Sequence, residues 1–318
     1  MAHIYVYSPS GAIVDRRAFH RGIKRLRALG HDVEVDTNAL ARFQRFAGDD
    51  ETRLAAITRA AASGADVALI SRGGYGLSRL LPRMPWSALD KATQGGTKLV
   101  GFSDFTTVQL GLLSQYPAAI SWAGPALCEG FGQLPGSGAP IDSEPDEIML
   151  ACFADMIDGS AEGTGWRLRA NDQRHLQASP AHLAENAPLW GGNLAMVNSL
   201  LQTPWWPGIQ HGVLFLEDVG EHPYRIERNL LQLLHAGVLD QQQAIVLGQF
   251  TNYRKASIDR GYSLAKAVEH LRVNTRTPII TNLPFGHVPT KVLLPVGARV
   301  DLVVENGEVF MVWGHLHG

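Results

Sequence analysis

The segment LVGFSDFTT (99–107) places a serine where it could act as a nucleophile. A short apolar run leads into Ser103, and the pattern from Thr106 onward is typical of a helix. A serine at such a junction projects its hydroxyl above the carboxyl edge of a parallel sheet, and the free N–H groups of the helix start can stabilise an oxyanion. The segment differs from the G-x-S-x-G elbow of α/β-hydrolases, because Phe105 stands where glycine is needed. The alternative is that Ser103 only caps the helix.

A glycine-rich loop, SRGGYG (71–76), follows an earlier apolar run. Its glycines would let the backbone approach a ligand closely, although the loop matches neither a Walker loop nor a G-x-G-x-x-G fingerprint. Open parallel sheets bind ligands at the carboxyl ends of their strands, and this favours a ligand cradle over a plain tight turn. A cradle would make Arg72, Gly73 and Tyr75 substrate-binding residues.

A serine hydroxyl becomes a good nucleophile only when a base takes its proton. Among 12 histidines, His287 is distinguished by its setting in LPFGHVP (283–289), where prolines and a glycine restrict the backbone. This setting suits a positioned imidazole and equally suits a rigid turn. The pair His315 and His317 lies within the last four residues, and we do not interpret it as a metal site because chain ends fray.

An acid must orient the base, and Glu217 is the leading candidate. It ends the apolar run VLFL (213–216) and so projects from a strand end, with Asp218 and Glu221 as nearby alternatives. A purely structural role for Glu217 would be a salt bridge to Arg225 or Arg228 in the next helix. Spacing alone does not decide between these roles.

The segment WGGNL (190–194) predicts a glycine turn that opens a helix. Trp190 could form the aromatic wall of a binding groove and Asn193 could supply an amide to a ligand. A plain helix start with a buried tryptophan is an equally good interpretation.

The elements that must position these residues alternate between strand and helix in the first part of the chain. Alternating strands and helices predict a mostly parallel sheet flanked by helices. Apolar runs predict strands at 4–7, 31–36, 67–70, 98–102 and 118–122, with helices near 19–26, 49–61 and 106–114. Later in the chain we expect helices at 146–156, 191–201 and 224–234, strands at 213–216, 245–247 and 278–281, and a hairpin within 291–313 that turns at 305–307.

The length of 318 residues favours about two domains. Glycine, proline and serine are concentrated at 129–140, which is the best linker candidate. We therefore predict an α/β amino-terminal domain over 1–128 that carries the nucleophile, a linker and connecting helix over 129–165, and a β-rich α/β carboxy-terminal domain over 166–318 that carries the acid and the base.

Composition excludes several classes of protein. The chain is 45% hydrophobic and 18% charged, which is ordinary for a globular protein. Its 28 Lys and Arg against 30 Asp and Glu give a net charge of −2, so we expect no nucleic-acid partner and no anionic membrane surface. The two cysteines, Cys128 and Cys152, make neither a disulfide scaffold nor a zinc pattern. No signal peptide or apolar span is recognisable, and we expect a soluble cytoplasmic protein.

Five segments together resemble the LD-carboxypeptidases, a family of serine peptidases that includes muramoyltetrapeptide carboxypeptidases and microcin-immunity peptidases. The segments are SRGGYG, GFSD, WGGNL, LEDVGEHPYRIERNLLQL (216–233) and LPFGHVPTKVLLPVGA (283–298). The resemblance implies that Ser103 is the nucleophile, Glu217 the triad acid and His287 the base. It further implies oxyanion donors at the backbone amides of Asp104 and Gly74, two domains with the site at their interface, no metal or other cofactor, and a homodimer.

The activity that this resemblance implies is removal of the terminal D-alanine from murein tetrapeptides in peptidoglycan recycling. Arg72 is the expected ligand of the terminal carboxylate, although it could instead brace its loop. Within the family, a peptidase that cleaves peptidyl-nucleotide antibiotics is the alternative. Outside it, the alternatives are a two-domain binding protein without catalysis and an α/β-hydrolase esterase, the latter disfavoured by Phe105 and by the second domain.

Overall fold

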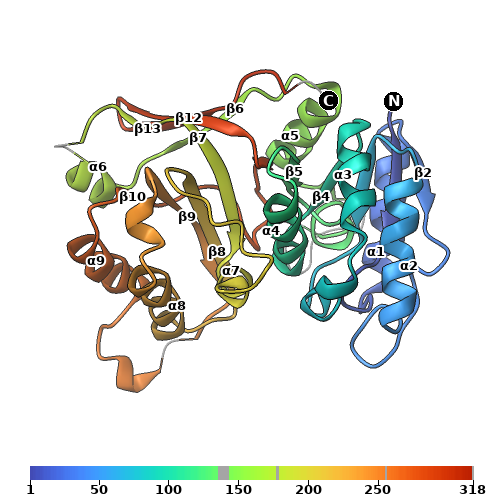
Figure 1. Ribbon diagram of the computed structural model, residues 1–318, viewed down its shortest axis with the longest axis horizontal. Helices are drawn as coiled ribbons and strands as arrows, with labels where there is room; N and C mark the ends of the chain where they lie inside the picture. Colours follow the sequence, from blue (N-terminus) through green and yellow to red (C-terminus); the bar gives the residue numbers. More distant parts are fainter. Residues whose placement is uncertain (135–142, 177–178, 255, 317–318) are drawn as a thin grey trace.

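The computed structural model describes residues 1–134, 143–176, 179–254 and 256–316. These residues form two sheets flanked by helices, and Figure 1 shows one sheet in each half of the molecule. The expected α/β architecture, with an amino-terminal parallel sheet and a β-rich carboxy-terminal part, is confirmed.

The first sheet is parallel except at one edge, where β11 runs antiparallel to β5. Its central strands are continuous apolar runs, and they are buried on both faces as expected for a parallel sheet covered by helices. In spatial order its strands are β11 (Leu294–Val296), β5 (Ser121–Ala123), β4 (Lys98–Gly101), β3 (Val67–Ile70), β1 (His3–Tyr7) and β2 (Asp32–Val35).

Helices connect the strands of this first half. Asp15 and Asp49 act as N-caps, because their carboxylates accept hydrogen bonds from backbone N–H groups of the first turns of α1 and α2. The helices are α1 (Arg16–Ala28), α2 (Asp50–Ala62), α3 (Trp86–Gln94), α4 (Thr106–Gln115) and α5 (Glu147–Asp158). Across the described residues, no helix has the length and apolar character needed to cross a membrane.

The second sheet is mixed. Strands β7 to β10 are parallel, and β12, β13 and β6 extend the sheet antiparallel from β7. The predicted hairpin is confirmed: Glu305 pairs with Glu308, and Asn306 and Gly307 form the turn with positive φ. In spatial order the strands are β10 (Ile279–Ile280), β9 (Ala244–Thr251), β8 (Val213–Val219), β7 (His182–Asn193), β12 (Arg299–Glu305), β13 (Glu308–Val312) and β6 (Gly163–Arg167).

The helices of the second half are α6 (Ala170–Leu176), α7 (Leu194–Leu200), α8 (Pro223–His235) and α9 (Leu264–Asn274). Helix α4 of the first half contacts both α7 and β7, and Figure 1 shows it between the two sheets. The helix that follows Ser103 therefore lies at the junction of the two halves.

The predicted helix over 191–201 is wrong in its first part. Strand β7 continues through Gly191 and Gly192 to Asn193, and α7 begins only at Leu194. The two glycines adopt φ values of 130° and 131°, which side chains rarely tolerate. A Cβ on Gly192 would also lie 2.4 Å from the hydroxyl of Thr106. These glycines thus allow a strand to pass closely over α4.

The domain division at 128 and 165 stays a prediction, and two strands bear on it. β11 belongs to the carboxy-terminal part of the sequence but completes the first sheet. β6 begins at Gly163, slightly before the expected start of the second domain. Of the predicted linker, residues 135–140 lie outside the described residues, while Phe131 just before them is fully buried.

Candidate active site

Ser103 lies directly beyond the carboxyl end of β4, in a short 3-10 turn that leads into α4. Its φ of 62° is a left-handed value that costs a non-glycine residue roughly 1–3 kcal/mol. Neither the turn nor α4 has a side-chain N-cap, so the capping role for Ser103 is contradicted. The strained turn instead directs the hydroxyl toward the second half of the molecule.

His287 approaches Ser103 from the loop that follows β10. Its Nε2 lies 3.2 Å from the Ser103 Oγ. The loop is held along the end of β9, where the N–H of Gln249 donates to the carbonyl of Phe285 at 2.9 Å. On its other side the imidazole packs against the Phe102 ring, with the ring centroids 4.8 Å apart.

Glu217 completes a chain of hydrogen bonds. It lies in β8 and is fully buried, and its Oε2 is 2.8 Å from His287 Nδ1. Because a carboxylate only accepts, Nδ1 carries the proton and Nε2 is left free to accept the Ser103 hydroxyl. The alternative salt bridge is contradicted: among the described residues Glu217 pairs with His287 and with neither Arg225 nor Arg228, and Arg225 lies 3.6 Å from Glu221 instead.

Two opposed effects set the protonation of His287. Burial disfavours the imidazolium, while the hydrogen bond and charge of Glu217, together with the charge of Glu129, favour it. The carboxylates win, so the pKa of His287 is raised above its ordinary value.

Asn193 orients Glu217. Its amide Nδ2 donates to Glu217 Oε1 at 3.2 Å and to Asp218 Oδ1 at 3.0 Å, and its Oδ1 accepts from the N–H of Met196 as the N-cap of α7. With the side-chain amide engaged and 5% of the residue exposed, Asn193 has the contacts of a positioning residue rather than of a ligand. Burial also raises the pKa of Asp218 to about 6.

Trp190 does not line a groove. It is fully buried, its Nε1 donates to Gln242 Oε1 at 3.0 Å, and its ring packs edge-on against Trp206. Because β7 extends past Trp190 and carries its indole into the core, the structure gives no support to the predicted substrate-binding role. Glycine next to a tryptophan indicated a turn, and the same pattern also suits a close-packed strand.

The 71–76 loop lies against the serine turn. A Cβ on Gly73 would come within 2.9 Å of the Ser103 Cβ, so only glycine fits there. Gly74 and Tyr75 are exposed and line a cavity of about 270 Å³. Arg72 also lines it, but its Nη1 donates to the carbonyl of Ala12 at 2.9 Å, so part of its guanidinium braces the loop.

Asp104 ties three loops together. Its Oδ2 accepts from the Ser10 hydroxyl at 2.5 Å and from the N–H of Leu77 at 3.0 Å. Burial raises the pKa of this carboxyl above its usual range. Its own N–H stands in the first turn of a helix, where no intrahelical acceptor exists. This geometry leaves the N–H open to an anion, as a role in an oxyanion hole requires.

Sequence reasoning missed two residues beside the triad. Phe102 carries no functional signal of its own in the sequence, yet it packs against the His287 imidazole. Lys291 received no role, yet it is only 1% exposed and its Nζ lies 4.8 Å from the Phe102 ring centroid. The only sequence signal was a lysine within an otherwise apolar stretch four positions after His287.

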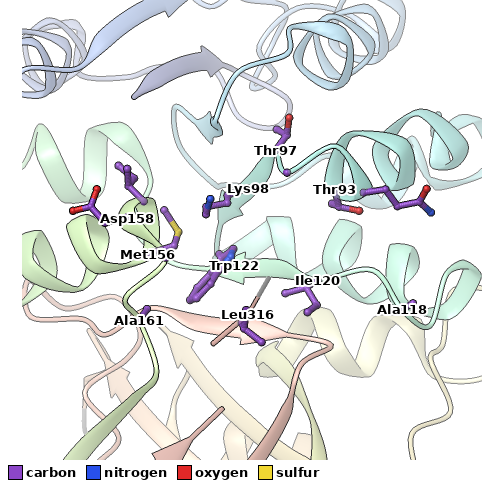
Figure 2. Close-up of a pocket in the computed structure, with 14 residues that line it drawn as sticks. Thr93, Thr97, Lys98, Ala118, Ile120, Trp122, Met156, Asp158, Ala161 and Leu316 are labelled. Atoms are coloured by element: carbon purple, nitrogen blue, oxygen red, sulfur yellow. The ribbon is translucent and has the colours of Figure 1, made fainter. Parts of the chain in front are cut away.

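A cavity of about 440 Å³ lies at the opposite edge of the first sheet (Figure 2). Its lining includes Thr97 and Lys98 at the start of β4, with Trp122 and Met156. Ser103 follows the other end of β4, so this cavity is remote from the triad. Among the described residues, no group of three or more His, Cys, Asp or Glu side chains is placed to hold a metal ion.

Comparison with known proteins matches both halves of the chain to one family. Residues 4–124 match the LD-carboxypeptidase N-terminal domain, and residues 186–302 match the LD-carboxypeptidase C-terminal domain. The chain belongs to the LD-carboxypeptidase family. It is accordingly an enzyme, a peptidase of the carboxypeptidase type.

Several LD-carboxypeptidase relatives span nearly the whole chain. The murein tetrapeptide carboxypeptidase of Pseudomonas aeruginosa is 30% identical over 88% of this chain and 86% of its own length. The solved muramoyltetrapeptide carboxypeptidase of Oxalobacter formigenes is 34% identical, covers 98% of both chains and superposes with a TM-score of 0.83. The microcin C7 self-immunity protein is 19% identical with a TM-score of 0.81 over 99% of this chain and 97% of its own, and at that identity it shows the fold alone.

Proposed function

We propose that this LD-carboxypeptidase removes the terminal D-alanine from murein tetrapeptides through a Ser-His-Glu triad. The observation that carries the proposal is the unbroken hydrogen-bond chain from Ser103 Oγ through His287 to Glu217, assembled from both halves of the molecule. The names of the relatives that are 30% and 34% identical support the murein substrate.

In this mechanism His287 acts first as a base and then as an acid. Its neutral Nε2 takes the Ser103 proton as Oγ attacks the carbonyl carbon of the scissile amide. The charge that develops on the imidazole is offset by the buried Glu217. The imidazolium then protonates the leaving nitrogen, D-alanine departs, and water hydrolyses the ester on Ser103 by the same route in reverse.

The negative charge on the carbonyl oxygen needs donors that are fixed in advance. The backbone N–H of Asp104 at the helix start and that of Gly74 in the exposed loop are the proposed pair. Two contacts support this pair. Gly73 closely approaches Ser103, and the carboxylate of Asp104 accepts from the N–H of Leu77, the residue that follows the 71–76 loop.

The direct test is mass spectrometry of a murein tetrapeptide incubated with the protein. We expect loss of one terminal alanine, and Ser103→Ala should lower kcat by about 10⁴-fold or more, as for other triad serines. Ser114→Ala is the matched control, because Ser114 lies at the far end of α4 and should leave the rate unchanged.

An unchanged tetrapeptide mass would contradict the proposal. Cleavage of a peptidyl-nucleotide in a parallel reaction would then point to the immunity-peptidase alternative, and cleavage of neither would point to a binding protein. The proposal also carries two expectations from the family resemblance: action in the cytoplasm during peptidoglycan recycling, and a homodimer in solution, which sedimentation velocity would detect.

A further inference from the structure

The buried ammonium group of Lys291 lies over the Phe102 ring, next to the proposed triad. Lys291 is 1% exposed, and no hydrogen bond or ion pair joins its Nζ to any residue that the structure describes. Removing a charged amine from water is costly unless an anion or hydrogen-bond acceptors replace the water. The site is therefore electrostatically incomplete in the free protein.

Three carboxylates act on Lys291 through their charge, and two of them, Glu217 and Asp146, are committed elsewhere. Glu217 binds His287 and Asn193, and Asp146 caps α5 and accepts the hydroxyl of Thr290. The Oε1 of Glu129 lies 3.9 Å from Arg72 Nε, while its Oε2 is buried without a hydrogen-bond partner among the described residues. These three acids act on Lys291 through their charge, and none lies within ion-pair distance of its Nζ.

The position of Lys291 relative to the triad identifies the missing anion. Its Nζ lies 4.8 Å from the centre of the Phe102 ring, and the imidazole of His287 packs against the same ring with the ring centroids 4.8 Å apart. In a serine peptidase the base delivers its proton to the leaving amine, so the leaving residue sits beside the base. In a carboxypeptidase substrate, a single Cα separates that amine nitrogen from the free terminal carboxylate.

We propose that Lys291 binds the terminal carboxylate of the substrate and thereby makes the enzyme a carboxypeptidase. The inference rests on the proposed function and deepens it, because it names the group that distinguishes a free chain end from an internal amide. Arg72, the residue expected from sequence to bind this carboxylate, is partly held by the carbonyl of Ala12. Lys291 has no such competitor.

The test compares two tetrapeptides, one with a free terminal carboxylate and one with a terminal carboxamide. We expect Lys291→Met to lower kcat/KM for the free acid about 50-fold, the size of a lost charge-assisted hydrogen bond, and to lower it far less for the carboxamide. Lys266→Met removes an exposed ammonium from α9 and is the matched charge control, with neither substrate affected.

Thermal unfolding separates a binding role from a structural one. Methionine fills a similar volume without a buried charge, so Lys291→Met should melt at or above the temperature of the wild type. Equal losses on both substrates with a lower melting temperature would overturn the inference. The inference would also be overturned if Arg72→Met lost the preference for the free acid over the carboxamide while Lys291→Met kept it.

The pH dependence gives an independent readout. Burial lowers the pKa of Lys291 to about 8, against the opposing charges of Glu129, Glu217 and Asp146. Cleavage of the free acid should therefore decline above about pH 8, as the ammonium loses its proton, while cleavage of the carboxamide should not. Parallel profiles for the two substrates would contradict the inference.

These outcomes separate the inference from the proposed function. If the wild type cleaves the free acid and Lys291→Met lowers kcat/KM equally for both substrates, only the role of Lys291 is contradicted. If the wild type cleaves neither peptide, the proposed function fails and the role of Lys291 fails with it.

Discussion

At the scale of single residues, Asn193 links the triad acid to the scaffold. We predict that Asn193→Ala lowers kcat about 100-fold, because Glu217 loses the amide that fixes one of its oxygens and the imidazole can then shift. The lost N-cap of α7 should also cost about 1 kcal/mol of unfolding free energy. Steady-state kinetics and denaturant unfolding measure the two effects separately.

Asn198→Ala is the control for Asn193→Ala. Asn198 lies on the same helix, and its amide donates to the carbonyls of Leu194 and Asn229 without touching the triad. It should lose stability and keep its kcat. Similar kcat losses in both variants would show that Asn193 acts through the stability of α7 alone.

The protonation of His287 predicts where activity fails in acid. Catalysis requires the neutral imidazole, and a raised pKa means that the imidazole is protonated at higher pH than usual. The midpoint of the fall in kcat/KM on acidification should therefore lie above pH 6.5, the value at which an unperturbed histidine would place it. The measurement is the pH profile of kcat/KM.

Glu217→Gln tests whether the Glu217 carboxylate causes the raised pKa of His287. Removing the carboxylate charge should move the acid limb of the profile to lower pH while reducing the maximum rate. An acid limb at or below pH 6.5 in the wild type, or one that stays in place in the variant, would contradict the assigned origin of the shift.

The three residues of the proposed triad could be singled out from sequence because each stands at the end of an apolar run or in a rigid turn, but their roles followed only from the resemblance to the LD-carboxypeptidases. Ser103 follows β4 and Glu217 closes the apolar run of β8. The partners that orient them could not be predicted. Asn193 meets Glu217 only because β7 and β8 are adjacent and in register, and Lys291 meets Phe102 only because the loop after β10 folds back over the first sheet.

At the scale of elements, β7 shows why the local sequence pattern at WGGN (190–193) predicted the wrong structure. The two glycines suggested a turn, but β7 needs them to pass within contact distance of α4 and β8. We predict that Gly192→Ala destabilises the fold by about 3 kcal/mol or more, because the new Cβ meets Thr106 in a backbone region that also disfavours side chains. Activity should fall with it, since the N–H of the neighbouring Asn193 donates to Thr106.

Gly96→Ala is the control for the cost of placing a side chain at positive φ. Gly96 also has positive φ, but a Cβ there would meet nothing within 4 Å. It should cost only about 1–2 kcal/mol and leave the activity intact. Denaturant unfolding of the two variants compares them, and equal costs would rule out the clash with Thr106.

At the scale of the whole molecule, the site exists only because the two halves meet. The serine comes from the first sheet, and the acid and base come from the second. The alternation of strands and helices could be predicted from composition and periodicity. The crossing of β11 back to β5 could not, because three apolar residues carry no signal of the sheet they will join.

The central claim is that Ser103 is a nucleophile activated across this junction. It is tested most directly by reacting the protein with a serine-directed phosphonate and locating the adduct by peptide mass spectrometry. The account predicts one adduct on Ser103 in the wild type and none in Ser103→Ala, with much slower labelling in His287→Ala. An adduct on another residue, or unchanged labelling without the imidazole, would contradict it.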